Sequence, residues 1–104
     1  MKKLRKYEEV VKRGIKILDS SASCPPNWKD NIKKEKLSLV SSINCPLGQV
    51  YGQYILGLKT LHPLQASNKY YLWDKWAIKN GFSAKTSNYG HESRLLAQEW
   101  KRQL

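Results

Sequence analysis

Two cysteines and two histidines are the residues of this sequence best suited to hold a metal ion. They are Cys24, Cys45, His62 and His91, and Zn²⁺ binds two thiolates and two imidazoles in a tetrahedral site. The sequence has no Cys-x-x-Cys pair, so only the fold would bring these four ligands together. One structural zinc ion held by the four side chains is therefore one hypothesis, because a small domain gains stability from a metal. Two buried thiols with two histidines at the surface are the alternative.

The same four residues would also supply a cysteine nucleophile and a histidine base. No further catalytic pattern accompanies them. The sequence has no Gly-x-Ser-x-Gly elbow, no glycine-rich phosphate loop and no His-Glu-x-x-His motif. We therefore expect a binding protein with no catalytic residues and not an enzyme.

The positive charge is the strongest signal in the composition. The 104 residues carry a formal net charge of +11, from 19 Lys and Arg against 8 Asp and Glu. Such an excess attracts nucleic acids, acidic protein surfaces and anionic membranes. On a helical projection of the first segment, one side is basic apart from Glu9. The candidate partner-binding residues on that side are Lys2, Arg5, Lys6, Arg13 and Lys16.

Apolar periodicity predicts a mainly α fold, with about four helices around one core in a single domain of residues 1–104. An α+β fold with a minor two-stranded element is the alternative, because Leu37 and Leu39 alternate with Ser38 and Val40. Trp28 and Ile32 are expected to point inward from a short helical turn. The four main helices are expected at about residues 3–19, 46–61, 67–80 and 90–103.

Glycine and proline define the predicted helix ends. Pro46 suits the first helical position behind a cap at Asn44 or Cys45, and Gly81 suits a left-handed helix end. Gly48 and Gly52 lower helix propensity inside the predicted helix, which indicates close packing of another element. Trp73 and Trp76, at helical spacing, are expected in the core, although aromatics among lysines also stack on nucleic-acid bases.

The stretch from Leu37 to Leu58 carries no charged side chain. Its polar residues and Pro46 favour a buried core over a membrane span. The basic start of the chain is not followed by an apolar run, so no signal peptide is expected. A cytoplasmic protein with reduced cysteines is therefore predicted.

Several short motifs together resemble a protein family. They are Leu18-Asp19, Pro26-Asn27-Trp28, the block Cys45-Pro46-Leu47-Gly48-Gln49-Val50-Tyr51-Gly52-Gln53-Tyr54, Gly81-Phe82 and Trp100. The string is similar to a family of small phage and prophage proteins with a Cys-x-Leu-Gly-Gln-x-Tyr-Gly core. In that family a second cysteine often precedes the one matching Cys45, and a histidine precedes Gly-Phe. Here Ser42 or Ile43 and Asn80 stand at those places, and Cys24 is a candidate substitute for the missing thiol.

The resemblance implies a role like that of phage anti-defence proteins, which include inhibitors of RNA-guided nucleases (anti-CRISPR proteins). The leading hypothesis is an inhibitor that binds a Cas-type host nuclease complex, or its nucleic acid, stoichiometrically through a basic surface. The alternative is a small basic accessory protein that binds nucleic acid and is stabilised by zinc. Both would act in the cytoplasm of a bacterial host cell.

Overall fold

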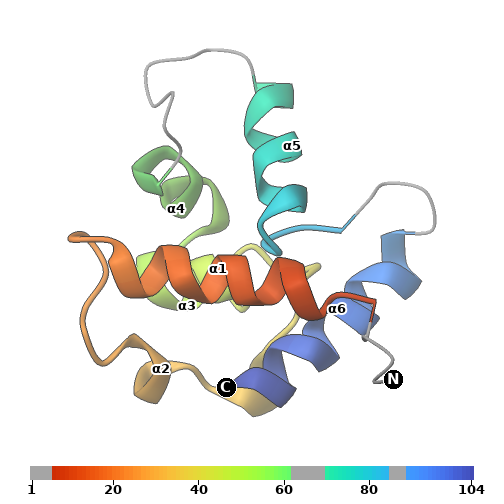
Figure 1. The fold of residues 1–104 in the computed structure, drawn as a ribbon, viewed down its shortest axis with the longest axis horizontal. Coiled ribbons are helices and arrows are strands. Elements are labelled where there is room, and N and C mark those ends of the chain that lie inside the picture. The colour runs from red at the N-terminus through yellow and green to blue at the C-terminus, as the bar shows by residue number, and fades with distance from the viewer. Residues whose placement is uncertain (1–5, 62–69, 85–88) are drawn as a thin grey trace.

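The computed structural model describes residues 6–61, 70–84 and 89–104, and these form an all-helical assembly (Figure 1). Its α-helices are α1 (Glu8–Ser20), α2 (Trp28–Asn31), α3 (Pro46–Tyr51), α4 (Tyr54–Leu61), α5 (Tyr70–Lys79) and α6 (Tyr89–Gln103), with a 3₁₀ turn at Lys34–Lys36. The predicted mainly α fold is confirmed. The minor two-stranded element is wrong for the described residues, which contain no strand. Leu37 and Leu39 are buried in an irregular segment whose backbone hydrogen bonds form turns and a contact with Tyr54, not a strand ladder.

The centre of the core lies where α1 crosses α6 and the end of α5. Trp100 is fully buried, stacks on Phe82 with ring centroids 5.9 Å apart, and donates from Nε1 to the Gly81 carbonyl at 2.7 Å. A Cβ on Gly14 would lie 2.5 Å from the Asn80 carbonyl oxygen. The absence of a side chain at Gly14 therefore lets α1 pack directly against the turn after α5.

That turn has the conformation predicted for it. Gly81 has a φ of 81°, in the left-handed region, and the Phe82 amide donates to the Ala77 carbonyl at 2.8 Å. The helix therefore ends and Phe82 returns to the core beside Trp76, with centroids 5.7 Å apart. Trp73 is buried and Trp76 is half-buried, so the core assignment for this pair holds.

The segment after α1 is held by Trp28, at the start of α2. Its ring is 1% exposed, and its Nε1 donates to Asp19 Oδ1 at 2.9 Å. Ile32 is also buried, as predicted. The Asp19–Trp28 hydrogen bond fixes the proline-containing loop between α1 and α2 against the end of α1.

The single helix predicted over residues 46–61 is wrong, because the chain breaks it into α3 and α4. Gly52 has a φ of 97°, and its amide closes α3 by donating to the Gly48 carbonyl at 2.8 Å. The Tyr54 amide then donates to the Ser42 carbonyl at 2.7 Å instead of to a helical acceptor. At Gly52 the requirement is conformational, since an added Cβ would meet nothing within 4 Å.

At Gly48 the requirement is steric, and here the predicted close packing is confirmed. A Cβ would lie 2.4 Å from the Ser42 carbonyl oxygen and 2.6 Å from the Ile43 carbonyl carbon. The segment of residues 37–45, named here the 37–45 loop, therefore rests directly on the backbone of α3. Cys45 caps α3, its Sγ accepting from the Gly48 amide at 3.3 Å.

Within the parts of the chain that the structure places, no helix has the length and apolar content needed to cross a bilayer.

Candidate partner-binding surface

The basic side predicted for the first helix is one candidate surface. The predicted start of that helix near residue 3 is wrong for the described residues, because α1 begins at Glu8 and Lys6 lies in the turn before it. Lys2 and Arg5 lie outside the described residues. The exposed Lys6 ammonium pairs with the Glu92 carboxylate at the start of α6. Hydrogen bonds from Lys6 and from the Tyr7 hydroxyl lower the pKa of Glu92. Burial, with the bond to Glu92, raises the pKa of Tyr7 to about 12. This contact ties the beginning of α1 to α6, so Lys6 has a structural partner.

Further along α1 the cations come together with a residue of α5. Arg13 Nη1 donates to the Lys79 carbonyl oxygen at 2.9 Å, which places the last residue of α5 beside α1. A carbonyl at a helix C-terminus carries partial negative charge, so the guanidinium is well suited to it. Lys16 lies one turn beyond Arg13 on the same side of the helix.

Arg13, Lys16 and Lys79 are named here the cation cluster. All three residues are exposed. Among the residues that the structure describes, none of the three has an acidic partner within ion-pair distance. Lys12 differs, because Glu8 and Glu9 lie within 4.0 Å of its ammonium. The cluster therefore joins two exposed cations of α1 to the α5 residue whose carbonyl Arg13 binds, and no described acid pairs with any of the three.

The four candidate metal ligands are not seen as one group. His62 lies outside the described residues, and His91 is exposed in the first turn of α6. Cys45 caps the start of α3, whereas Cys24 lies beside Tyr51 at its end. The placed residues hold no group of three or more His, Cys, Asp or Glu side chains able to bind a metal. Cys24, Cys45 and His91 are placed and do not form such a group, and His62 lies outside the described residues, so the zinc site stays a prediction.

The two thiols have little nucleophilic character in this environment. Burial raises the pKa of both Cys24 and Cys45, although hydrogen bonds to each thiol act in the opposite direction. Both side chains are therefore neutral thiols at neutral pH. Activated cysteines show the reverse, a pKa lowered by a positive environment.

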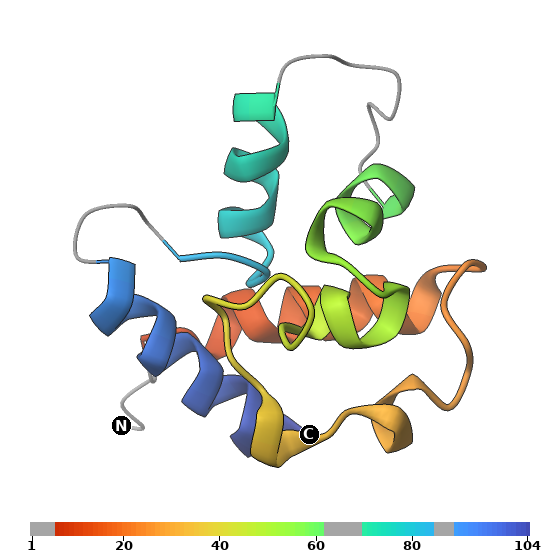
Figure 2. The same cartoon turned by 180° about the vertical axis from the view of Figure 1, so that it is seen from behind.

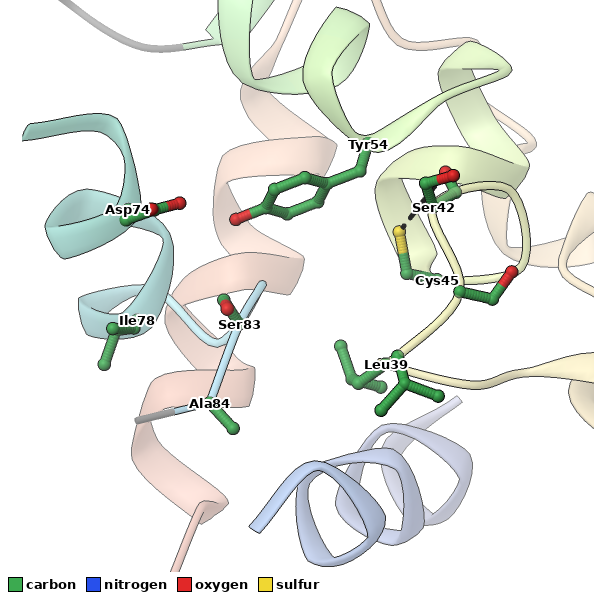
Figure 3. Close-up of a pocket in the computed structure, with 10 residues that line it drawn as sticks. Leu39, Ser42, Cys45, Tyr54, Asp74, Ile78, Ser83 and Ala84 are labelled. Atoms are coloured by element: carbon green, nitrogen blue, oxygen red, sulfur yellow. Dashed lines mark hydrogen bonds between the residues drawn. The ribbon is translucent and has the colours of Figure 1, made fainter. Parts of the chain in front are cut away.

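Cys45 borders an open pocket of about 270 Å³ between the 37–45 loop and α5 (Figure 3). The thiol is directed to the Ser42 carbonyl at 3.9 Å, and the Tyr54 ring extends across the pocket toward Asp74. Leu39, Ile78 and Ala84 form an apolar wall. The pocket brings together one carboxylate with hydroxyl and thiol groups, and no histidine, lysine or arginine is among the described residues that line it.

Several residues of the family-like motifs have structural partners. Gln49 makes three hydrogen bonds: its Oε1 accepts from the Lys33 amide at 2.6 Å, and its Nε2 donates to the carbonyls of Lys33 at 3.2 Å and Asn44 at 3.0 Å. Asp19 holds Trp28, and Gly48 admits the 37–45 loop. These motif residues therefore make contacts within the protein around α2 and α3. Residues that bind a partner are to be sought outside the motif.

Sequence reasoning missed the exposed apolar side chains of the 37–45 loop. Val40 is 61% exposed and Ile43 is 57% exposed, although both belong to the uncharged stretch that was expected to be buried. The available signal was composition: Ser38, Ser41, Ser42 and Asn44 separate these apolar residues and favour local hydrogen bonds over a helix or a strand.

No protein-family model matches this chain, and neither a curated protein nor a solved structure is similar to it.

Proposed function

We propose that this protein is a phage-type anti-defence inhibitor, which binds a host nuclease complex stoichiometrically in the bacterial cytoplasm. The observation that carries the proposal is the cation cluster, where Arg13, Lys16 and Lys79 gather from two helices without an acidic partner among the placed residues. The net charge of +11 and the family resemblance of the motifs add support.

A cluster of this kind favours an acidic surface on the partner. Opposite charges accelerate encounter and select against basic partners, and the effect weakens as salt screens it. The α1 backbone beneath the cluster is held by packing on Trp100 and Asn80, so little ordering is needed on binding.

The test is capture of partners on immobilised protein from lysates of bacteria that carry RNA-guided nucleases, with nuclease treatment before capture. We expect subunits of a nuclease complex, identified by mass spectrometry, in a fixed ratio to the bait. Lys16→Glu and Lys79→Glu should each weaken this capture about tenfold, since a charge reversal in a salt-screened contact is worth about 1.4 kcal/mol.

Lys59→Glu is the matched control, because Lys59 is an exposed lysine on α4, outside the cluster. It should leave capture unchanged. Recovery of bulk nucleic acid alone, lost after nuclease treatment, would contradict the inhibitor and favour the second candidate.

That second candidate is a nucleic-acid-binding accessory protein, and the cation cluster supports it equally on charge grounds. A gel-shift titration across salt distinguishes it. The logarithm of its affinity should fall with the logarithm of salt at a slope of about −0.9 for each phosphate contacted on duplex DNA. No binding at low salt would exclude this function.

We also propose that zinc stabilises the fold through Cys24, Cys45, His62 and His91, and metal analysis of protein without a histidine tag tests this directly. About one equivalent is expected. Less than about a tenth of an equivalent would reject a structural site, because such sites bind tightly.

A further inference from the structure

The 37–45 loop is rigidly held, in spite of its lack of regular secondary structure. Its backbone is closed by bonds from the Ser38 amide to the Asn44 carbonyl at 3.3 Å and from the Cys45 amide to the Ser41 carbonyl at 3.1 Å. The Ser41 hydroxyl accepts from the Asn44 amide at 3.2 Å. Gln49 of α3 donates to the Asn44 carbonyl, and the backbone of the loop packs directly against Gly48.

This framework directs two branched apolar side chains into solvent. Val40 and Ile43 are each more than half exposed, whereas Leu37 and Leu39 of the same segment are buried. Val40 borders both the pocket beside Cys45 and a second open pocket of about 440 Å³ against α6. Ile43 borders a third of about 270 Å³ against Lys33 and Lys36. The loop is thus an apolar projection with an open pocket on each side.

Cations surround this projection. Lys33 and Lys36 line the pocket next to Ile43, and Arg94 and Lys101 of α6 line the pocket next to Val40. Within the described part of the chain these four have no ion-pair partner. Of the nearby acids, Glu92 pairs with Lys6 and Glu99 lies 3.8 Å from Arg102. Asp74 lines the pocket between Val40 and Cys45, and Glu35 lies between Lys34 and Lys36, so the cations near the loop outnumber these two acids.

We propose that the 37–45 loop is a second docking surface, which binds an acidic polypeptide segment whose apolar side chains cover Val40 and Ile43 while its carboxylates meet Lys33, Lys36, Arg94 and Lys101. Charge complementarity selects this occupant. A second copy of the chain brings the same net charge of +11 and would be repelled. Nucleic acid would match the cations, but it stacks on aromatic side chains and has no use for two aliphatic ones.

This surface is separate from the cation cluster. Figure 1 shows α1 toward the viewer, and Figure 2, turned by 180°, shows the 37–45 loop, in yellow, toward the viewer. Each surface can therefore be altered by substitutions that leave the other in place. The loss of one function does not imply the loss of the other.

The test is a selection from a random peptide display library on the immobilised full chain. We expect enriched peptides with Leu, Ile or Phe flanked by Asp and Glu. Synthetic copies of these peptides should bind the Val40→Ser/Ile43→Ser variant at least about tenfold more weakly, because burial of each aliphatic side chain is lost. Lys33→Gln/Lys36→Gln and Arg94→Gln/Lys101→Gln should each weaken them about fivefold or more.

Leu56→Ser and Lys59→Gln are the matched controls, since both residues are exposed on α4 and line none of the three pockets. They should leave peptide affinity unchanged, and Lys16→Glu should do so as well. No enriched peptide, or peptides that bind the Val40→Ser/Ile43→Ser variant as tightly as the unaltered protein, would overturn the proposal. Displacement of the peptides by a DNA oligonucleotide with loss only in the Lys and Arg variants would assign the surface to nucleic acid instead.

Discussion

The basic side of α1 and the 37–45 loop are two exposed regions with opposite relations to the rest of the molecule. At α1, exposed cations also bind other helices. Lys6, just before α1, pairs with Glu92 of α6, and Arg13 donates to the last carbonyl of α5. In the loop, backbone groups, Ser41 and Gln49 make the hydrogen bonds and Leu37 and Leu39 are buried, whereas the side chains of Val40 and Ile43 are mostly exposed. Charge alone therefore does not locate a contact surface in this protein. Exposed side chains that make no contact within the protein are a better guide to a contact surface.

The largest loss of stability is expected where the 37–45 loop packs on α3. In Gly48→Ala the new methyl would lie 2.4 Å from a carbonyl oxygen, and backbone atoms yield at high cost. We expect destabilisation of about 3 kcal/mol, measured by urea unfolding. Gly90→Ala is the control, because a Cβ there meets nothing within 4 Å and α6 gains helix propensity. Equal stability of the two variants would contradict the close contact between the loop and α3.

A smaller loss is expected from the side chain that ties the loop to α3. Gln49→Ala removes bonds to Lys33 and Asn44, and leaves backbone groups of both residues without this partner. We expect the free energy of unfolding to fall by about 1–3 kcal/mol. Gln98→Ala, at an exposed position of α6, should change it by less than about 0.5 kcal/mol. A Gln49 variant as stable as the Gln98 variant would show that the loop is held by other contacts.

On α1, Arg13 and Lys16 should differ in their contribution to the free energy of unfolding. Arg13→Gln loses the hydrogen bond to the Lys79 carbonyl and should cost about 1 kcal/mol in urea unfolding. Lys16→Gln should change stability by less than about 0.5 kcal/mol, because no described group depends on it. If neither substitution changed the free energy of unfolding, the hydrogen bond from Arg13 to the Lys79 carbonyl would not contribute to stability.

The smallest effect concerns pH. The pKa of Glu92 is lowered in the folded state from the ordinary 4.5. A group of this kind stabilises the fold above its unfolded pKa, and the contribution is lost as pH falls through the folded pKa. Between neutral pH and about pH 3, the native chain should therefore lose more stability than Glu92→Gln, measured by urea midpoints at both pH values. Parallel losses in the two proteins would contradict the pairing of α1 with α6.

Local signals predicted where most of the helices lie, although not the division of residues 46–61 into α3 and α4. The apolar stripe through Val11 and Leu18, the proline at the start of α3 and the glycine after α5 predicted elements that the structure contains. The break at Gly52 was not predictable in this way. It depends on the Tyr54 amide finding the Ser42 carbonyl, a contact set by how the 37–45 loop folds back on α3.

The candidate surfaces were predicted less completely, because they also depend on contacts between segments that are distant in the sequence. A helical projection gathers Lys6, Arg13 and Lys16, but it contains no information about Glu92 or Lys79, which tertiary packing brings to them. It also treats an uncharged segment as core. Val40 and Ile43 are exposed because the Ser41 hydroxyl and the Gln49 amide satisfy backbone groups of the loop, so the segment needs no helix or sheet.

Stoichiometric inhibition through the cation cluster can be measured by titrating this protein into a DNA cleavage reaction. The reaction uses a purified RNA-guided nuclease complex identified by the capture experiment. We predict that cleavage falls linearly and ends at about one equivalent of protein per complex, at any DNA concentration. Lys16→Glu should shift the curve to higher protein and Lys59→Glu should leave it in place. Cleavage that persists at a large excess of this protein would contradict stoichiometric inhibition. Inhibition that depends on the amount of DNA rather than on the amount of complex would contradict it as well.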